Sequence, residues 1–306
     1  MKQYYPSAGL AQLCGLFGKT RQAFYDITRR SSDDRLQEAF IIDKVKSIRQ
    51  QIKGIGGSQL HGMLKQELQL HNISIGRDRF YDLLRSHDLL IKRKKHYAVT
   101  TNSNHPYYKW PDLSANVTLT AIEQLWVSDI TYLRTENGFV YLSLITDAWS
   151  RKIIGYHVSQ HLKAQGCIIA LNKAIASLQA TQTEKRKLLH HSDRGIQYCC
   201  EPYIAILQKN NIGISMTQTG SPYDNAIAER VNGILKHQLG LNQVFKNYPE
   251  AVAAVCKAID AYNCLRPHRS ISNLTPQKAH NTTRSLVKTW KNNKKYKLYN
   301  DNEPGV

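Results

Sequence analysis

The sequence predicts an α/β protein in which a mixed five-stranded sheet with helices follows small all-helical domains. Apolar residues recur at helical spacing through roughly the first 90 residues, as in Leu60, Leu64 and Leu68. Beyond about residue 120 they gather instead into short runs separated by turn residues, which is typical of strands. A chain of 306 residues is long enough for such an arrangement with a sizeable core.

The charge of the chain predicts a polyanionic partner. Lys and Arg total 42 against 23 Asp and Glu, a net charge of +19, and nucleic acid is the commonest partner of so basic a surface. The apolar runs are short and interrupted, so we expect no membrane span and a soluble, intracellular protein. None of the six cysteines has the spacing of a zinc site, and we expect reduced thiols.

The N-terminal part is predicted to hold two helix-turn-helix units. In residues 1–30 an apolar helix is followed by a turn at Gly18 and a second helix that begins near Arg21, although a plain helical hairpin fits nearly as well. Residues 36–92 repeat this pattern, and Arg77 and Arg79 open the last helix, where a recognition helix presents its DNA-contacting side chains. Arg21, Arg77 and Arg79 are therefore predicted to contact DNA.

Two basic segments flank the region that contains the sheet. Residues 93–118 lack periodicity and are predicted to be a linker, in which Lys94 and Lys95 could follow a phosphate backbone. Residues 286–306 are predicted to be a basic tail.

Residues 119–285 carry the predicted sheet. Three runs, 124–133, 139–147 and 152–158, predict consecutive strands, the first two joined by a turn with the favoured Asn137-Gly138 pair. A helix, a short strand (188–191), another helix, a fifth strand (214–216) and a long helix (224–239) follow. Three antiparallel strands and then alternating helices and strands is the order of a ribonuclease-H-like fold.

Three carboxylates in this region predict a metal site. Asp129 lies in the middle of an apolar strand, where an unpaired carboxylate is costly, and Asp193 lies just past a strand end. Glu229 lies on the long helix. Phosphodiester chemistry needs an activated nucleophile and a stabilised leaving oxygen, and two Mg²⁺ ions held by carboxylates supply both.

The helix that carries Glu229 has one polar face. Asn225, Glu229, Asn232 and Lys236 follow one another at spacings of three and four residues and therefore share a face. We expect Asn225, Asn232 and Lys236 to contact DNA beside the carboxylates. The opposite face is apolar and is predicted to pack in the core.

Five segments resemble one known family. They are WVSDITYL (126–133), TDAWSRKIIGYHVS (146–159), HHSDRGIQY (190–198), TGSPYDNAIAERVNGILK (219–236) and YNCLRPHRSISNLTP (262–276). In this order they resemble insertion-sequence transposases of the OrfB type, the IS-three family, within the DDE group related to retroviral integrases. Trp149, Val231 and Asn232 depart from the common pattern without touching the three carboxylates.

The resemblance implies a site and its partners. Asp129, Asp193 and Glu229 would be the catalytic triad, with two Mg²⁺ (or Mn²⁺) ions. The implied substrates are the terminal inverted repeats of an element and a target duplex. Oligomerisation on DNA is expected, and a small helix-turn-helix partner or a frameshift fusion with it is possible within the family.

Further residues are expected to support the site. Arg194 could hold a phosphate with its guanidinium, and the group around Pro267 is predicted to contact DNA; its members are Arg266, His268 and Arg269. His190 or His191 could approach the scissile phosphate, with a structural histidine as the equal alternative.

Two other functions remain open from the residues. One is a non-catalytic DNA-binding protein with a degenerate core, which the complete set of three carboxylates disfavours. The other is a nuclease of the ribonuclease H or Holliday-junction type, which would share the fold and the metals but does not need two N-terminal helical domains.

Overall fold

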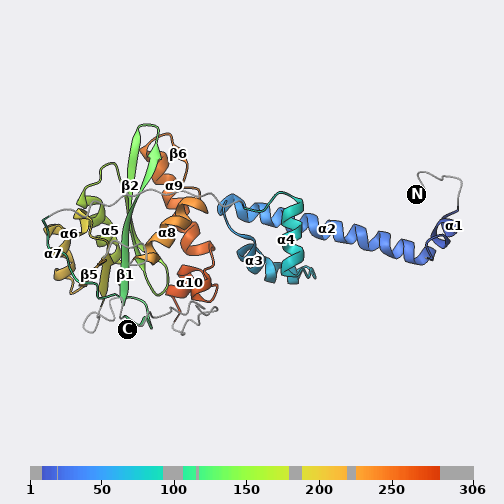
Figure 1. Cartoon of the computed structure of the whole chain (residues 1–306), viewed down its shortest axis with the longest axis horizontal. Coiled ribbons are helices and arrows are strands. Elements are labelled where there is room, and N and C mark those ends of the chain that lie inside the picture. Colours follow the sequence, from blue (N-terminus) through green and yellow to red (C-terminus); the bar gives the residue numbers. More distant parts are fainter. Residues whose placement is uncertain are drawn as a thin grey trace, which may run out of the picture. The chain divides into compact units, whose positions relative to one another are not determined.

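A computed structural model of the chain describes residues 9–18, 20–91, 106–114, 117–178, 188–218 and 225–282 (Figure 1). It divides into two compact units, Met1–Lys94 and Lys95–Val306. Lys94, Lys95 and the predicted basic tail lie outside the described residues. No helix in the described part is long and apolar enough to cross a membrane.

The first unit is helical, as predicted. Its elements are α1 (Leu10–Gly15), α2 (Arg21–Gln51), α3 (Gly57–Leu70) and α4 (Arg77–Ser86). Their apolar stripes form a core in which Val45, Leu60, Phe80 and Leu84 are inaccessible to solvent. The predicted turn between α3 and α4 is present, and Asn72 adopts a left-handed conformation there (φ 56°).

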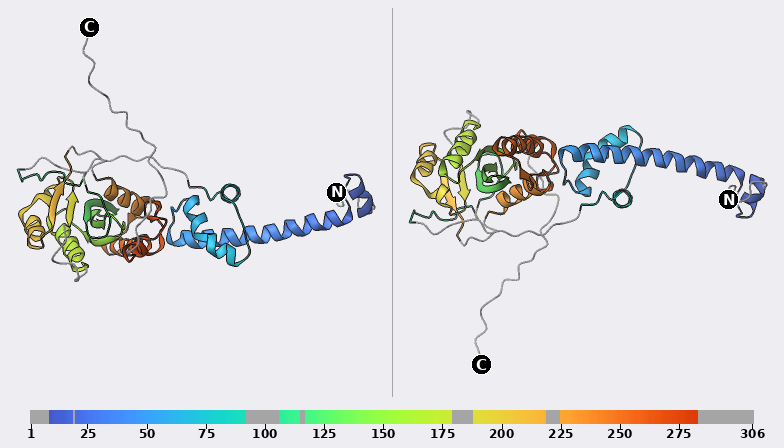
Figure 2. Two further views of the ribbon diagram at one scale, coloured as in Figure 1. Left: turned by 90° about the horizontal axis from the view of Figure 1, so that it is seen from below. Right: turned by 90° about the horizontal axis from the view of Figure 1, so that it is seen from above.

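The predicted boundary near residues 30–36 is wrong. Helix α2 runs without interruption from Arg21 to Gln51, as the views in Figures 1 and 2 show. This range contains neither Gly nor Pro, so nothing in it forces the helix to end. The polar run Arg29–Asp34 interrupts the apolar stripe, but a run of polar residues is compatible with a helix. The two predicted helical domains therefore share one long helix.

The second unit contains a mixed sheet with the strand order β3-β2-β1-β4-β5. Its strands are β1 (Leu125–Thr135), β2 (Gly138–Asp147), β3 (Ile153–Ser159), β4 (Leu189–Ser192) and β5 (Gly213–Met216). Strands β1 to β3 are antiparallel neighbours, whereas β4 and β5 run parallel to β1. This is the ribonuclease-H-like order that the sequence predicts. The predicted turn joins β1 to β2, with Gly138 at φ 120°.

Helices cover both faces of this sheet (Figure 1). On one face lie α5 (Ala164–Ala176), α6 (Ile196–Cys199) and α7 (Glu201–Lys209), and on the other lie α8 (Ala226–His237) and α9 (Tyr248–Asp260). Successive residues of β1 point to opposite faces. Trp126 therefore packs against α5 and α7, while Val127 and Leu133 pack on the side of α8.

The elements after α8 had no predicted counterpart. They are a short strand β6 (Val244–Phe245), helix α9, a π-helical turn (Ala261–Leu265), a 3-10 turn (Arg269–Ile271) and α10 (Pro276–His280). Strand β6 adds a sixth, two-residue strand to the predicted five. A start signal for α9 was present in the sequence, because Asn247 caps the helix by accepting a hydrogen bond from the Glu250 N–H at 3.0 Å.

Strand β3 and helix α5 approach each other closely at Gly155. A Cβ atom on Gly155 would lie 2.2 Å from the Ala170 carbonyl oxygen and 2.9 Å from the Ala174 Cβ. We expect Gly155→Ala to lower the free energy of unfolding by about 1–3 kcal/mol or more, because backbone atoms cannot yield as a flexible side chain does.

Chemical denaturation of the full chain measures this effect. Gly233→Ala is the matched control, since Gly233 lies inside α8 with no atom within 4 Å of an added Cβ, and alanine there should stabilise by up to about 1 kcal/mol. Equal stability of the two variants would contradict the expected close packing of α5 on β3.

Candidate active site

The site lies at the point on β1 where its parallel pairing with β4 ends. The pairing of β1 with β4 ends at Val127↔His191, and the pairing with β6 begins only at Arg134↔Val244. Asp129 lies on β1 two residues beyond the first of these points, and Asp193, which directly follows β4, is two residues beyond His191. Parallel strands lie about 4.8 Å apart and paired residues point to the same face. Both aspartates therefore emerge side by side at one opening of the sheet.

The pKa of Asp129 reflects this arrangement. Its carboxylate accepts hydrogen bonds from the Asn232 side-chain amide (2.6 Å) and the Ile130 N–H (2.9 Å). These bonds lower its pKa, but burial and then the nearby Asp193 charge outweigh them and raise the pKa to about 7; Glu229 adds a smaller effect of the same sign. A carboxylate that is costly to ionise next to another carboxylate favours binding of a cation.

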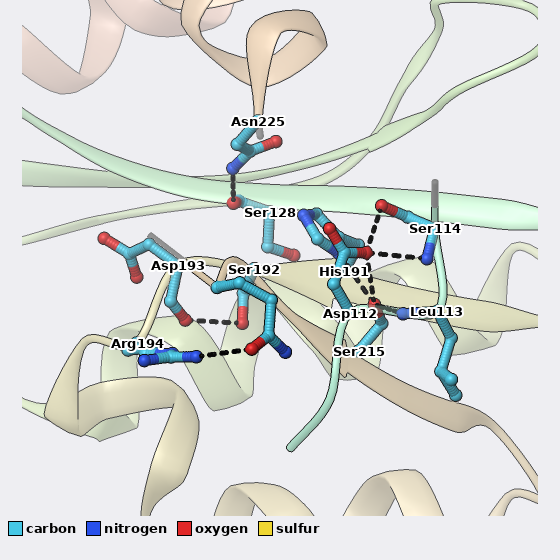
Figure 3. Close-up of polar contacts among 11 residues, drawn as sticks. Asp112, Leu113, Ser114, Ser128, His191, Ser192, Asp193, Arg194, Ser215 and Asn225 are labelled. Carbon is cyan, nitrogen blue, oxygen red and sulfur yellow. Dashed lines mark hydrogen bonds and ion pairs between the residues drawn. The ribbon is translucent and has the colours of Figure 1, made fainter. Parts of the chain in front are cut away.

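Asp193 is held by the backbone that follows it. The Gly195 N–H donates to Asp193 Oδ1 at 3.0 Å. The Ser192 hydroxyl donates to the Asp193 carbonyl at 3.0 Å, as Figure 3 shows. A Cβ on Gly195 would approach the same Oδ1 to 3.0 Å. The glycine after Asp193-Arg194 therefore leaves space for the carboxylate, a role that the sequence analysis did not assign.

The polar face of α8 contacts β1 at several points along the helix. The Asn225 amide donates to the Ser128 carbonyl at 2.9 Å (Figure 3), Asn232 contacts Asp129, and Lys236 Nζ lies 4.5 Å from the centroid of the Tyr132 ring. The predicted polar face thus turns toward the β1 edge at Asp129. Asn225 and Asn232 are buried there, so they hold the site together, and a DNA contact by either is not supported by their position.

Glu229 lies on this polar face but stays apart from the two aspartates. Its side chain is exposed, and partial desolvation raises its pKa. Among the described residues, no group of three His, Cys, Asp or Glu side chains is close enough to hold a metal ion. The structure therefore brings Asp129 and Asp193 together and places Glu229 within electrostatic range of Asp129. On the opposite side of α8, Val231 and Ile234 are in the core as expected, and Ile227 is half-buried.

The two predicted histidines are both buried. His190 faces away from Asp129, with its Nε2 2.6 Å from the Ser128 hydroxyl and 2.9 Å from the Tyr203 hydroxyl, and burial lowers its pKa to about 3. His190 is therefore a structural residue. His191 Nδ1 lies 2.8 Å from the Ser215 hydroxyl and 3.8 Å from an Asp112 oxygen (Figure 3).

Asp112 lies in the predicted linker, which corrects the boundary at residue 118. Its carboxylate accepts from the N–H and hydroxyl of Ser114, the Leu113 N–H donates to the Ser215 hydroxyl at 2.9 Å, and the Met216 N–H contacts the Pro111 carbonyl at 3.3 Å. Residues 111–113 thus contact β5, and this segment belongs to the second unit. Their sequence lacks periodicity because they extend along a strand end without forming a helix or strand.

The predicted DNA contacts differ in accessibility. Arg21, Arg77 and Arg79 are exposed in the helical unit. Arg77 pairs with the adjacent Asp78 at 2.9 Å, and Arg79 lies 3.5 Å from Asp34 and 3.9 Å from Glu38 on α2. These surface pairs are weak and would not prevent contact with a phosphate.

The predicted basic group around Pro267 is only partly exposed. Arg269 is exposed, but Arg266 and His268 are 2% and 7% exposed. Arg266 Nε donates to the Gln238 side chain at 2.8 Å, and its Nη1 donates to the Pro267 carbonyl at 3.2 Å. Arg266 and His268 are therefore not surface residues, because the chain after the π-helical turn folds both side chains inward, and their contact with DNA stays a prediction. Arg194, which is half-buried, donates to Gln218 at 3.2 Å.

Most of the chain is similar to known proteins. Two family models described as integrase core domain match residues 120–222 and 210–276. The chain is 31% identical over 268 residues to the insertion element IS600 uncharacterized 31 kDa protein of Shigella sonnei, which covers 86% of this chain and 96% of that protein. It is 36% identical over 159 residues to the transposase InsF for insertion sequence IS3A of Escherichia coli (strain K12), covering 52% and 54%.

A further relative is the transposase for insertion sequence element IS629 of Shigella sonnei, 34% identical and covering 51% of each chain. The chain thus spans about half the length of these two transposases. Among solved structures, the HTLV-2 integrase catalytic core domain in complex with magnesium aligns with a TM-score of 0.41 and 19% identity, covering 52% of this chain and 97% of that one. By its near-complete match to the insertion-element protein and its integrase core domain, the chain belongs to the IS3-type transposases, polynucleotidyl transferases with a DDE core.

Proposed function

We propose that this transposase cuts DNA at the ends of its element and joins the freed 3′-hydroxyl to another strand, with Asp129, Asp193 and Glu229 as catalytic residues. The observation that carries the proposal is the Asp129–Asp193 pair. Two carboxylates meet at an opening of the sheet, and the pKa of Asp129 is raised to about 7 by burial and by Asp193. An alternative role as a non-catalytic DNA-binding protein would not require this costly pair.

The donor set fits divalent cations. Asp129 and Asp193 offer hard carboxylate oxygens, which Mg²⁺ and Mn²⁺ prefer. We propose that two such ions bind between them, and that Glu229 completes the site. When bound, the ions supply activation of the attacking oxygen and stabilisation of the leaving oxygen. Glu229 reaches ligand distance either by a change of rotamer or by a shift of α8, since its side chain is exposed and free of the core.

The chain's own groups orient the carboxylates. The Asn232 amide fixes Asp129 Oδ2 from α8, and the Gly195 N–H fixes Asp193 Oδ1. The Asn225 amide holds the start of α8 against Ser128. Positioning of this kind lowers the barrier because the reacting groups need little rearrangement during the reaction.

We assign the proposed contacts with DNA to the two units separately. We propose that the helical unit binds the terminal inverted repeats through Arg21, Arg77 and Arg79, and that Arg194, Arg269 and Lys236 contact DNA near the carboxylates. Joining two ends requires more than one copy on DNA, so a homo-oligomer is proposed, and a small helix-turn-helix partner remains compatible with it.

Removal of any one of the three carboxylates should abolish the reaction. We expect Asp129→Asn, Asp193→Asn and Glu229→Gln each to reduce Mg²⁺-dependent cleavage and joining by at least about 1000-fold, in keeping with the large effect of losing part of a unit that acts together. DNA affinity should be retained, because Lys and Arg supply most of it.

Assays with duplexes that carry the element's ends measure both quantities. Glu201→Gln is the control, since Glu201 is an exposed carboxylate at the start of α7. Strand transfer at the wild-type rate by any of the three variants would refute the assignment.

The raised pKa of Asp129 predicts a pH dependence of stability without metal. Because the pKa is about 7 in the folded chain and about 3.9 in the unfolded chain, the folded state binds the proton more tightly. The stabilising contribution is present at low pH and is lost as the pH rises to about 7. Asp129→Asn carries no such charge, so it should gain stability relative to wild type between pH 5 and pH 8 by at least about 1 kcal/mol.

Thermal unfolding in EDTA at the two pH values checks this, with Glu201→Gln again as the control. Parallel pH profiles for wild type and Asp129→Asn would show that the carboxyl of Asp129 is not perturbed by its surroundings.

The helical unit should bind the element's ends by itself. Residues 1–94 form a compact unit with a core of their own, and we expect the fragment to prefer a duplex of the terminal repeat over random duplex. Affinity should fall steeply with salt, with a slope that reflects the phosphates contacted. Arg77→Gln with Arg79→Gln should weaken binding by about tenfold or more and reduce this slope by about 2.

Fluorescence anisotropy across a salt series measures both effects. Arg85→Gln is the matched control, because Arg85 is an exposed arginine at the opposite end of α4. If the control loses as much DNA affinity as the double variant, the DNA-contacting surface does not lie at the start of α4.

A further inference from the structure

A group of basic and polar side chains converges beside α8, outside the carboxylate site. It comprises Arg151 in the turn between β2 and β3, Arg230 on α8, Arg266, and two ring side chains, Tyr262 and His268. We propose that these five residues form a second phosphate-binding site, which holds a backbone phosphate of the DNA substrate. The identity of the ligand rests on the proposed function, whereas the site itself does not.

Two of the five residues, Tyr262 and His268, are buried, and each has a polar atom without a hydrogen-bond partner among the described residues. Tyr262 is inaccessible to solvent and His268 is 7% exposed, and their rings meet edge to face with centroids 4.9 Å apart. Among the residues that the structure describes, neither the Tyr262 hydroxyl nor His268 Nε2 has a hydrogen-bond partner. Buried polar groups are nearly always paired, so an unpaired hydroxyl and an unpaired ring nitrogen together indicate a ligand.

Three guanidinium groups lie within electrostatic range of these two side chains. Arg266, Arg151 and Arg230 each act electrostatically on both Tyr262 and His268. Burial, followed by these positive charges, lowers the pKa of His268 to about 2. His268 is therefore a neutral ring that can donate one hydrogen bond, and the positive charge of the site comes from the arginines alone.

The arginines are arranged as a buried base and an accessible rim. Arg266 is buried and is oriented by its bond to Gln238. Arg151 is half-buried and Arg230 is exposed, and within the described part of the chain neither forms an ion pair. Of the three guanidinium groups, that of Arg230 is therefore the one most accessible to an anion from solvent.

The backbone of the turn that carries Arg151 is held by hydrogen bonds to Asp147. The Asp147 carboxylate accepts bonds of 2.8 Å from the N–H and the hydroxyl of Ser150 and from the Glu123 N–H. Arg151 follows in a left-handed conformation (φ 65°), which a non-glycine residue keeps only where surrounding contacts impose it. The guanidinium is therefore presented from a fixed backbone.

The chemistry of the group selects a phosphate. Guanidinium forks bind the tetrahedral oxyanion through paired hydrogen bonds, and a tyrosine hydroxyl and a neutral imidazole add donors without charge. Arg230 directly follows Glu229, and adjacent helical residues are separated by 1.5 Å along the axis and about 100° around it. A phosphate held here would lie on the side of α8 next to its catalytic face, where a neighbouring phosphate of the same DNA would extend.

The test uses the metal-free full chain in EDTA, so that its outcome does not depend on the carboxylates or on activity. One arm measures thermal stabilisation by inorganic phosphate at constant ionic strength. The other measures the affinity for a fluorescent duplex across a salt series. The variants are Arg151→Gln, Arg230→Gln and Tyr262→Phe, and the control is Arg134→Gln, an exposed arginine at the end of β1 that is not part of the group.

We expect Arg151→Gln and Arg230→Gln each to lose the stabilisation by phosphate and to reduce the salt slope of DNA binding by about 1, the effect of one lost phosphate contact. Tyr262→Phe keeps every charge, so it should weaken DNA binding by about tenfold with an unchanged slope. Arg134→Gln should retain the stabilisation by phosphate.

Two results would overturn the proposal. If the variants match Arg134→Gln in both arms, the group binds no phosphate. If they lose the response to inorganic phosphate but bind DNA with the wild-type slope and affinity, the site takes free phosphate and its assignment to DNA is wrong. Should Tyr262→Phe fail to fold, Arg230→Gln decides the matter, because Arg230 is exposed.

Discussion

The site depends on the register between β1 and β4. Because these parallel strands pair up to Val127 and His191 and no further, Asp129 and Asp193 leave the sheet side by side at its opening. Burial and mutual repulsion then make the ionised pair costly, which raises the pKa of Asp129 to about 7. The fold holds two like charges where only a cation, or a proton, relieves them.

Helix α8 connects this pair to the rest of the protein. One of its faces packs Val231 and Ile234 into the core, and another fixes Asn232 on Asp129. Glu229 lies on the latter face, and within the described part of the chain no contact holds it near the aspartates. The pair is therefore set by the sheet, whereas the third carboxylate depends on a helix that can adjust when ligands bind.

The region after α8 has a larger role than its sequence suggests. Strand β6 extends the edge of β1, and the π-helical turn carries Tyr262 into the core and brings Arg266 and His268 inward. Side chains that look like a surface basic patch thus become the floor of an internal anion site. Its positive charge lies beside α8, close to the excess negative charge of the carboxylates, which suits a substrate that carries many phosphates.

The sequence by itself determined the order of the strands, the helical N-terminal part and the three carboxylates. These features are local: periodicity gives the elements, the Asn137-Gly138 turn fixes the β1–β2 hairpin, and a carboxylate inside the apolar run of Asp129 is unusual wherever the chain folds. Helix α2 was predicted as two pieces because a polar run resembles a break, although no residue in it ends a helix.

Only the tertiary structure decided which polar residues are buried and which meet. A sequence gives no sign that residues 111–113 contact β5, that Asn225 binds the β1 backbone, or that Arg266 turns inward. Each of these contacts joins segments far apart in the chain, and burial depends on what packs over a residue from elsewhere. Side-chain identity supplies the chemistry, but the sheet register and the packing of α8 assign each polar group to the site, to the core or to the surface.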